Sequence, residues 1–140
     1  MFFIVPIYGY DLNYRQYIVE IGSGIDLHGE DETKAAQRAV RDAIGHASMV
    51  GLGKLFKVES FKEIDEGLLV DVTIATPNPE KVDGDAVLSS LPEGHRRITI
   101  VKGGIQFPTP KTPDEVRTHG IVVTNAVIVV LVDVDVLKRY

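Results

Sequence analysis

The chain has 140 residues, of which 44% are hydrophobic and 25% are charged, proportions typical of one globular domain and not of a disordered tail or a fibre. It carries 15 basic and 20 acidic side chains, and the resulting formal charge of −5 argues against nucleic acid or an anionic membrane as a partner. The absence of cysteine excludes disulfides, thiol nucleophiles and Cys-ligated zinc. We expect a single domain over residues 1–140.

Neither a membrane span nor a secretory leader is expected. The longest apolar run, Ala126 to Val132, has seven residues, whereas a membrane helix needs about 20. The first residues, Met1 to Pro6, lack the positive start and the small-residue cleavage site of a signal peptide. We therefore expect a cytoplasmic protein.

The first half of the chain predicts a strand followed by a helix. Residues 15–21 alternate with the two-residue period of a strand, and a glycine-rich turn over residues 22–29 follows them. Acidic residues at 30–32 suit the first turn of a helix, because they complement its dipole. Alanines at three- and four-residue spacing from Ala36 to Ala47 predict a helix that packs closely on a sheet. We expect it to end at the glycines Gly45, Gly51 and Gly53.

The second half predicts three more strands and a short helix. Residues 68–75 alternate most clearly, with Leu68, Val70, Val72 and Ile74 on one face. Asn78 and Pro79 suit an N-cap and a first helical position, and they open a short helix that runs to Leu91 and that Gly84 could interrupt. The other strands are predicted at residues 97–101 and 121–136. Residues 102–120, rich in glycine and proline, predict a long irregular loop between them.

This order, βαβαββ, predicts an α/β (α+β) domain with a four-stranded mixed sheet and helices on one face. Residues 55–64 either extend the second strand or pair with it, and residues 1–8 could add a further strand. Both alternating faces of residues 127–132 are apolar, so both should be buried, although two helices cover only one side of a sheet. Either the N-terminal stretch or a second copy of the chain would cover the other side, and the small size of the domain favours a homo-oligomer.

Residues 22–29, Gly-Ser-Gly-Ile-Asp-Leu-His-Gly, place three glycines and a polar cluster where a strand passes into a helix, a common ligand position in α/β folds. A structural interpretation is a tight turn with positive φ, in which Asp26 or His28 caps the helix. A phosphate-binding loop is a second interpretation. Two features oppose it: the third glycine, Gly29, falls two residues later than in the Gly-x-Gly-x-x-Gly motif, and the acidic residues 30–32 would repel a phosphate. A metal site on Asp26 and His28 is a third, with His46, His119 or another subunit as a further ligand.

Acid–base or nucleophilic chemistry is a fourth interpretation of the same cluster. Ser23 has an open hydroxyl between two glycines, and it needs a base to act as a nucleophile. Asp26, His28 and Lys102 are residues of the right type, and the two glycines after Lys102 could donate backbone N–H groups to an oxyanion. Asn125, within an apolar strand, predicts a buried amide that ties down a loop or lines a pocket. His46, near a helix C-terminus, suits a structural role.

Residues 22–29 resemble the Gly-x-Gly-x-Asp-x-His-Gly signature of a small uncharacterised family found in bacteria and plants, which carries no established activity. More distantly, residues 23–27 and 39–44 resemble one repeat of the ring-opening amidohydrolases, the cyanuric acid hydrolase and barbiturase group. The second resemblance implies a chorismate mutase-like or YjgF-like trimer fold, chemistry based on serine and lysine, and no cofactor. The chain departs from that group in its Asp-x-His-Gly extension and in lacking a recognisable lysine motif.

The leading hypothesis is a trimeric small-molecule enzyme with its site between subunits and a cyclic amide or similar carbonyl-rich substrate. Ser23 would be the nucleophile or orient water, Lys102 or His28 the base, and Asp26 would orient His28. Backbone and amide groups would bind the substrate at Gly22, Gly24, Gly29, Gly103, Gly104 and Asn125. The alternatives are a non-catalytic metabolite-binding or interaction oligomer and a metal site on Asp26 and His28; neither nucleic acid nor a membrane is expected as a partner.

Overall fold

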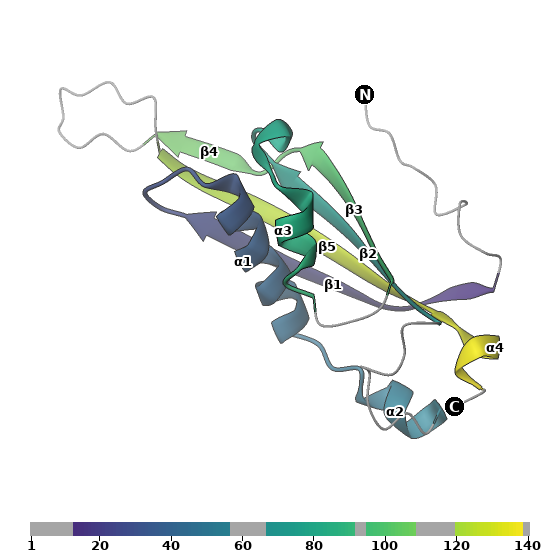
Figure 1. The fold of residues 1–140 in the computed structure, drawn as a ribbon. Helices are drawn as coiled ribbons and strands as arrows, with labels where there is room; N and C mark the ends of the chain where they lie inside the picture. The colour runs from purple at the N-terminus through teal and green to yellow at the C-terminus, as the bar shows by residue number, and fades with distance from the viewer. Residues whose placement is uncertain (1–12, 57–66, 92–94, 109–119, 139–140) are drawn as a thin grey trace, which may run out of the picture.

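A five-stranded β-sheet forms the centre of the protein, as the computed structural model shows (Figure 1). The structure describes residues 13–56, 67–91, 95–108 and 120–138. The strands β1 (Tyr14–Asp26), β5 (Gly120–Asp133), β2 (Leu68–Thr76) and β3 (His95–Lys102) lie side by side in that order. β5 is antiparallel to both β1 and β2, whereas β2 and β3 are parallel, so the sheet is mixed.

The short strand β4 (Ile105–Pro108) was not expected from the sequence, which predicted an irregular loop at this position. β2 pairs with β5 from Val132 only as far as Asn125, and β4 then pairs with the remaining residues of β5, from Val123 to Gly120. β4 therefore continues the position of β2 in the sheet and pairs with the part of β5 that β2 does not reach. The sheet has five strands instead of the four predicted because this pairing supplies the hydrogen bonds that four otherwise irregular residues need.

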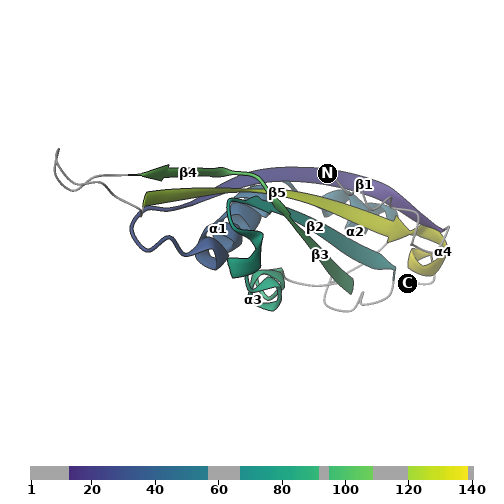
Figure 2. The ribbon, with the colours of Figure 1, turned by 90° about the horizontal axis from the view of Figure 1, so that it is seen from above.

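Helices cover one face of this sheet (Figure 2). α1 (Glu32–Gly45) and α3 (Gly84–Leu88) both lie on that face, and a 3₁₀ turn, η3 (Pro79–Lys81), precedes α3. Asp31 caps α1 by accepting a hydrogen bond from the Lys34 backbone N–H at 3.0 Å, close to the start that the acidic residues predicted. The mixed α+β class is confirmed.

The core lies between α1, α3 and the covered face of the sheet. The alanine-rich stripe of α1 is fully buried there, as predicted, and the alternating face of β2 lies opposite it. Branched side chains of β5 complete the core. The residues with no measurable exposure include Ala36, Ala39, Val40, Ala43, Val72, Ile74 and Ile128.

Several element boundaries differ from those predicted. α2 (Val50–Phe56) is a separate helix that contains Gly51, one of the glycines expected to end the first helix. The predicted helix from 78 to 91 is divided just before Gly84, the residue expected to interrupt it, because Asp83 caps a new helix through the Ala86 N–H, and this helix ends at Leu88. β5 ends at Asp133, whose carboxylate caps α4 (Val134–Leu137), so the final strand is shorter than predicted. The interpretations of residues 1–8 and most of 55–64 lie outside the described residues.

The other face of the sheet carries no helix in the part of the chain that the structure describes (Figure 2). Apolar side chains are exposed on it, with Ile21 at 67% and Val127 at 37%. Val127 was expected to be buried; one chain by itself leaves it partly open. None of the described helices is long and apolar enough to cross a membrane.

Candidate functional site

The glycine-rich motif occupies the second half of β1 and the loop that joins it to α1. β1 extends to Asp26, so Gly22, Ser23 and Gly24 lie inside the strand and not in a turn as predicted. The loop from Leu27 to Glu30 then leads to the Asp31 cap of α1. A hollow of about 650 Å³ lies beside this loop and the first two turns of α1.

Gly22 and Gly24 allow α1 to lie directly on β1. A Cβ atom on Gly22 would stand 2.3 Å from the Ala43 nitrogen, and one on Gly24 would stand 1.9 Å from the Ala35 carbonyl oxygen. Both contacts are with backbone atoms, which cannot move unless the helix moves. Close helix–strand packing therefore accounts for both glycines.

Asp26 joins the end of β1 to the start of α1. Its carboxylate accepts hydrogen bonds from the Asp31 backbone N–H at 2.9 Å and from Arg38 Nη1 at 3.2 Å. The Asp31 N–H, aided by the Gly29 N–H and the charges of Lys34 and Arg38, holds the Asp26 pKa below its usual value. Asp26 is 7% exposed and fully engaged, so it organises the loop, and no hydrogen bond among the described residues joins it to His28.

The loop follows a backbone path different from the one predicted. The residue with positive φ is Glu30, at 50°, whereas Gly29 does not have a positive φ. A Cβ atom on Gly29 would stand 3.2 Å from Asp26 Oδ2, a tight contact that a small shift of the Asp26 carboxylate would have to relieve. The Glu30 carboxylate in turn accepts a hydrogen bond from the Gly120 N–H, which ties the loop to the start of β5.

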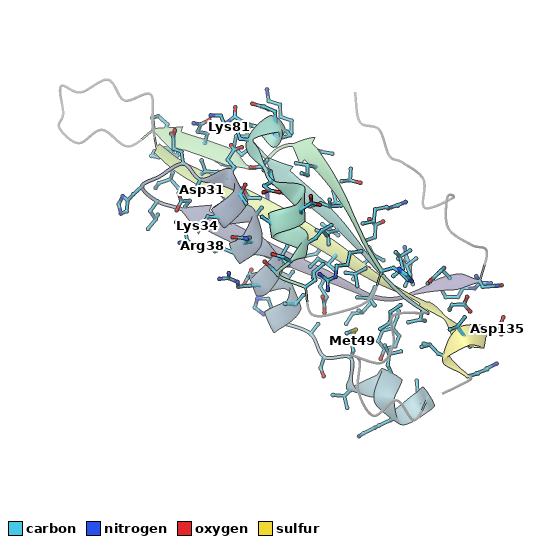
Figure 3. All side chains as sticks on the ribbon, in the orientation of Figure 1. Asp31, Lys34, Arg38, Met49, Lys81 and Asp135 are labelled. Carbon is cyan, nitrogen blue, oxygen red and sulfur yellow. The ribbon has the colours of Figure 1, made fainter. Side chains whose placement is uncertain are left out.

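Three basic side chains line the hollow: His28 from the loop, and Lys34 and Arg38 from α1. Lys34 and Arg38 are four residues apart and so point from the same side of the helix, where Figure 3 shows them next to Asp31. Arg38 uses Nη1 for both of its hydrogen bonds, to Asp26 and to the Ile25 carbonyl oxygen. Sequence reasoning missed Lys34 and Arg38 as site residues, although their spacing opposite the alanine stripe was a usable signal.

Ser23 lies on the uncovered face of the sheet and does not line the hollow. Its hydroxyl lies 3.0 Å from Asn125 Oδ1 on β5, to which it donates. Asn125 is exposed in the single chain and not buried as predicted. The backbone N–H of Ser23 donates to Asp42 Oδ2 at 2.9 Å, and Asp42 Oδ1 lies 2.9 Å from His46 Nε2. These contacts lower the Asp42 pKa, chiefly through the Ser23 N–H, and they cover part of the open edge of β1.

Lys102 lies far from Ser23 within one chain. Three strand spacings separate them, because β5 and β2 lie between β1 and β3, and at 4.8 Å per spacing this is about 14 Å. Lys102 is in register with Thr76, which faces the helices, whereas Ser23 faces the other side. A serine–lysine pair therefore requires a second chain.

Gly103 and Gly104 carry the chain from β3 across the end of β2 to β4. The Gly103 N–H donates to the Thr76 carbonyl oxygen at 3.0 Å, so this group already has a partner. Gly104 has a φ of 63°, and a Cβ atom on it would stand 2.1 Å from the Val123 carbonyl oxygen. The close passage of the backbone from β3 to β4 explains why both residues are glycines, so an oxyanion-binding role is not needed to explain them.

Within the described ranges, no group of three or more His, Asp or Glu side chains is arranged to hold a metal ion. Both oxygens of Asp26 are engaged, and His46 bonds to Asp42 at the other end of α1 from the loop. His119, the other residue considered as a ligand, lies outside the described residues. The metal interpretation on Asp26 and His28 gains no further ligand from this part of the chain.

An open mixed sheet with helices on one face and a charged hollow at the strand-to-helix loop defines an α+β protein with a candidate ligand site. The chain belongs to a family of conserved hypothetical proteins, Lin0512_fam, whose model matches residues 16–130. The prediction of an uncharacterised family is thereby confirmed. The resemblance to ring-opening amidohydrolases stays a prediction.

The chain is also similar to a protein of known structure. A crystal structure of an FtsZ-like protein of unknown function from Nostoc punctiforme PCC 73102 has 31% sequence identity and a TM-score of 0.71. The similarity covers 86% of this chain and 97% of the other. Among curated proteins, none matches this chain.

Proposed function

We propose that this protein binds a small molecule rich in hydrogen-bond acceptors in the hollow beside the β1–α1 loop. The observation that carries the proposal is a pair of side-chain donors there that lack acceptors. The Asp26 carboxylate already has its partners and Asp31 Oδ1 accepts from the Lys34 backbone N–H, whereas the Lys34 ammonium and the His28 ring have no hydrogen-bond partner among the described residues. A ligand would supply the acceptors that these groups lack.

The walls of the hollow define the rest of the ligand. Ile25 and Leu27 line it and are 44% and 51% exposed, so they offer an apolar surface beside the charges. A carboxylate, a phosphate or the carbonyl groups of a cyclic amide would meet Lys34 and Arg38, while an apolar body covers Ile25 and Leu27. The hollow is large enough for a metabolite, at about 650 Å³.

Replacing Lys34 by alanine is expected to weaken binding of such a ligand about tenfold, because a charge-assisted hydrogen bond is lost. Succinate, inorganic phosphate and succinimide are suitable probes, followed by amide chemical shifts in NMR titrations. The matched control is Lys54→Ala, on the exposed surface of α2, which should leave binding unchanged. The proposal is wrong if none of the probes shifts the loop amides, or if both lysine variants bind alike.

The proposal includes self-association through the uncovered face of the sheet. Ile21 and Phe107 are 67% and 59% exposed there, and a second copy would bury both while enclosing the Ser23–Asn125 pair. The hydrolytic alternative, with Ser23 as nucleophile and Lys102 as base, rests on the same association, since one chain keeps these residues apart.

Light scattering of the wild-type protein at micromolar concentration is expected to give a multiple of 15.4 kDa. Ile21→Lys should shift the mass toward one chain, because a charge in an apolar interface is left without a partner. Leu55→Lys is the control: Leu55 is 72% exposed, but it lies on α2 and not on the sheet. A wild-type monomer, or equal dissociation of both variants, would contradict this part of the proposal.

A further inference from the structure

A second cavity lies between the helices and the sheet, at the opposite end of α1 from the hollow. Its volume is about 210 Å³. The sheet, the end of α1 and the segment after it, where Figure 3 labels Met49, supply its walls. The apolar residues that line it include Ile44, Ala47, Met49, Val70, Ile128 and Val130. Such a space is suited to an apolar ligand body.

One carboxylate faces this apolar space. Glu20 of β1 lines the cavity, is 7% exposed and lies opposite Ile128 of β5. No hydrogen bond or ion pair engages its carboxylate within the described segments, and burial raises its pKa. A buried carboxylate costs free energy unless a donor or a cation meets it. The packing of the described part of one chain therefore leaves the Glu20 carboxylate without a donor, and a ligand could supply one.

We infer that this cavity binds a small organic ammonium ion, with its N–H groups donating to the Glu20 carboxylate and its apolar body filling the space between Ile44 and Ile128. An apolar cavity of about 150 Å³ accommodates a benzene molecule. The cavity here, at about 210 Å³, has room for one aromatic ring and a short aminomethyl arm. A pair of opposite charges in a desolvated site forms stronger hydrogen bonds than a neutral pair, so the ammonium group is the feature that Glu20 would select.

Benzylamine is the probe for this site, with benzyl alcohol as its neutral counterpart and benzoate as its charge-reversed counterpart. Titrations followed by the methyl signals of Ile128 and Val130 should show saturable binding of benzylamine to the full chain. We expect benzyl alcohol to bind about tenfold more weakly and benzoate to cause no saturable shift. This result is independent of the hollow, where benzoate and not benzylamine carries the suitable charge.

Two variants separate the charge from the shape of the site. Glu20→Gln keeps the size of the side chain and should weaken benzylamine about tenfold while benzyl alcohol binds as before, which also shows that the variant is folded. Ala47→Leu adds three carbon atoms to the wall and should weaken both ligands. The inference is overturned if benzylamine binds no better than benzyl alcohol, if Glu20→Gln keeps the preference, or if benzylamine shifts only the amides around Lys34.

Discussion

Replacing Gly24 by alanine is expected to lower the free energy of unfolding by about 3 kcal/mol, at the upper end of the usual cost of overpacking a core. The added Cβ would stand 1.9 Å from the Ala35 carbonyl oxygen and 2.4 Å from the Ala39 nitrogen. Both are backbone atoms of α1, so the clash is relieved only if the helix moves away from β1. Gly22→Ala should act in the same direction, since its Cβ would stand 2.3 Å from the Ala43 nitrogen.

The chain offers a matched control for this prediction in Gly45, the last residue of α1. No atom lies within 4 Å of a Cβ built on Gly45. Gly45→Ala should therefore be neutral or raise stability by about 0.5 kcal/mol, because alanine has the higher helix propensity. Urea unfolding followed by circular dichroism measures both variants. Equal stabilities for the Gly24 and Gly45 variants would show that α1 does not pack on β1 as described.

Replacing Asp26 by asparagine is expected to cost about 2 kcal/mol at neutral pH, the range measured for hydrogen bonds to charged groups. The carboxylate is 7% exposed and accepts from the Asp31 N–H and from Arg38 Nη1. Asparagine keeps the shape of the side chain but loses its charge. Its NH₂ group is a donor and cannot accept from the Asp31 N–H or from Arg38. The loop between β1 and α1 should become less ordered, and so should the walls that it supplies to the hollow.

The cost of this substitution should depend on pH in a definite direction. The folded-state pKa of Asp26 is lowered from 3.8, chiefly by the Asp31 N–H. Its carboxylate therefore contributes its full stabilisation above the unfolded pKa of 3.8, and that contribution is lost as the pH falls through the lower folded pKa. Urea unfolding at pH 7 and near pH 2 should show a large difference between wild type and variant at pH 7 and a small one at the lower pH.

Asp85→Asn is the control for charge alone. Asp85 is exposed in the first turn of α3, so its substitution should change stability by only a few tenths of a kcal/mol at either pH. If the Asp26 and Asp85 variants lose the same stability at pH 7, the hydrogen bonds of Asp26 do not hold the loop.

Much of the fold was predictable from periodicity alone. The apolar residues of α1 repeat over several helical turns, and those of β2 alternate over several pairs of residues. Both elements were located correctly. β4 was missed because its four residues are too few to show a period, and all four are exposed. The division of residues 79–88 into two short helices was anticipated at Gly84, whereas the cap at Asp83 that starts the second helix was not.

The sequence located the passage from strand to helix but not how its side chains are arranged. Residues 22–29 were singled out correctly as the passage from strand to helix, and Asp26 and His28 do lie at the hollow there. Ser23 faces away from α1 because alternate residues of a strand point to opposite faces, and β1 continues through it. Glu20 attracted no notice, since a single acidic residue in a strand looks like a solvent-exposed position until its neighbours are known.

Local sequence patterns were sufficient to predict the α+β class, the alanine helix that packs closely on a strand, and the position of the motif that links them. These features depend on residues close together in the chain, whose spacing is visible without a structure. The folded chain was needed to show that Gly22 and Gly24 make room for α1, that Lys102 and Ser23 lie three strand spacings apart, and that Glu20 faces an apolar cavity. Each of these depends on strand order or on contacts between distant residues, for which a glycine, a lysine or a glutamate carries no local signal.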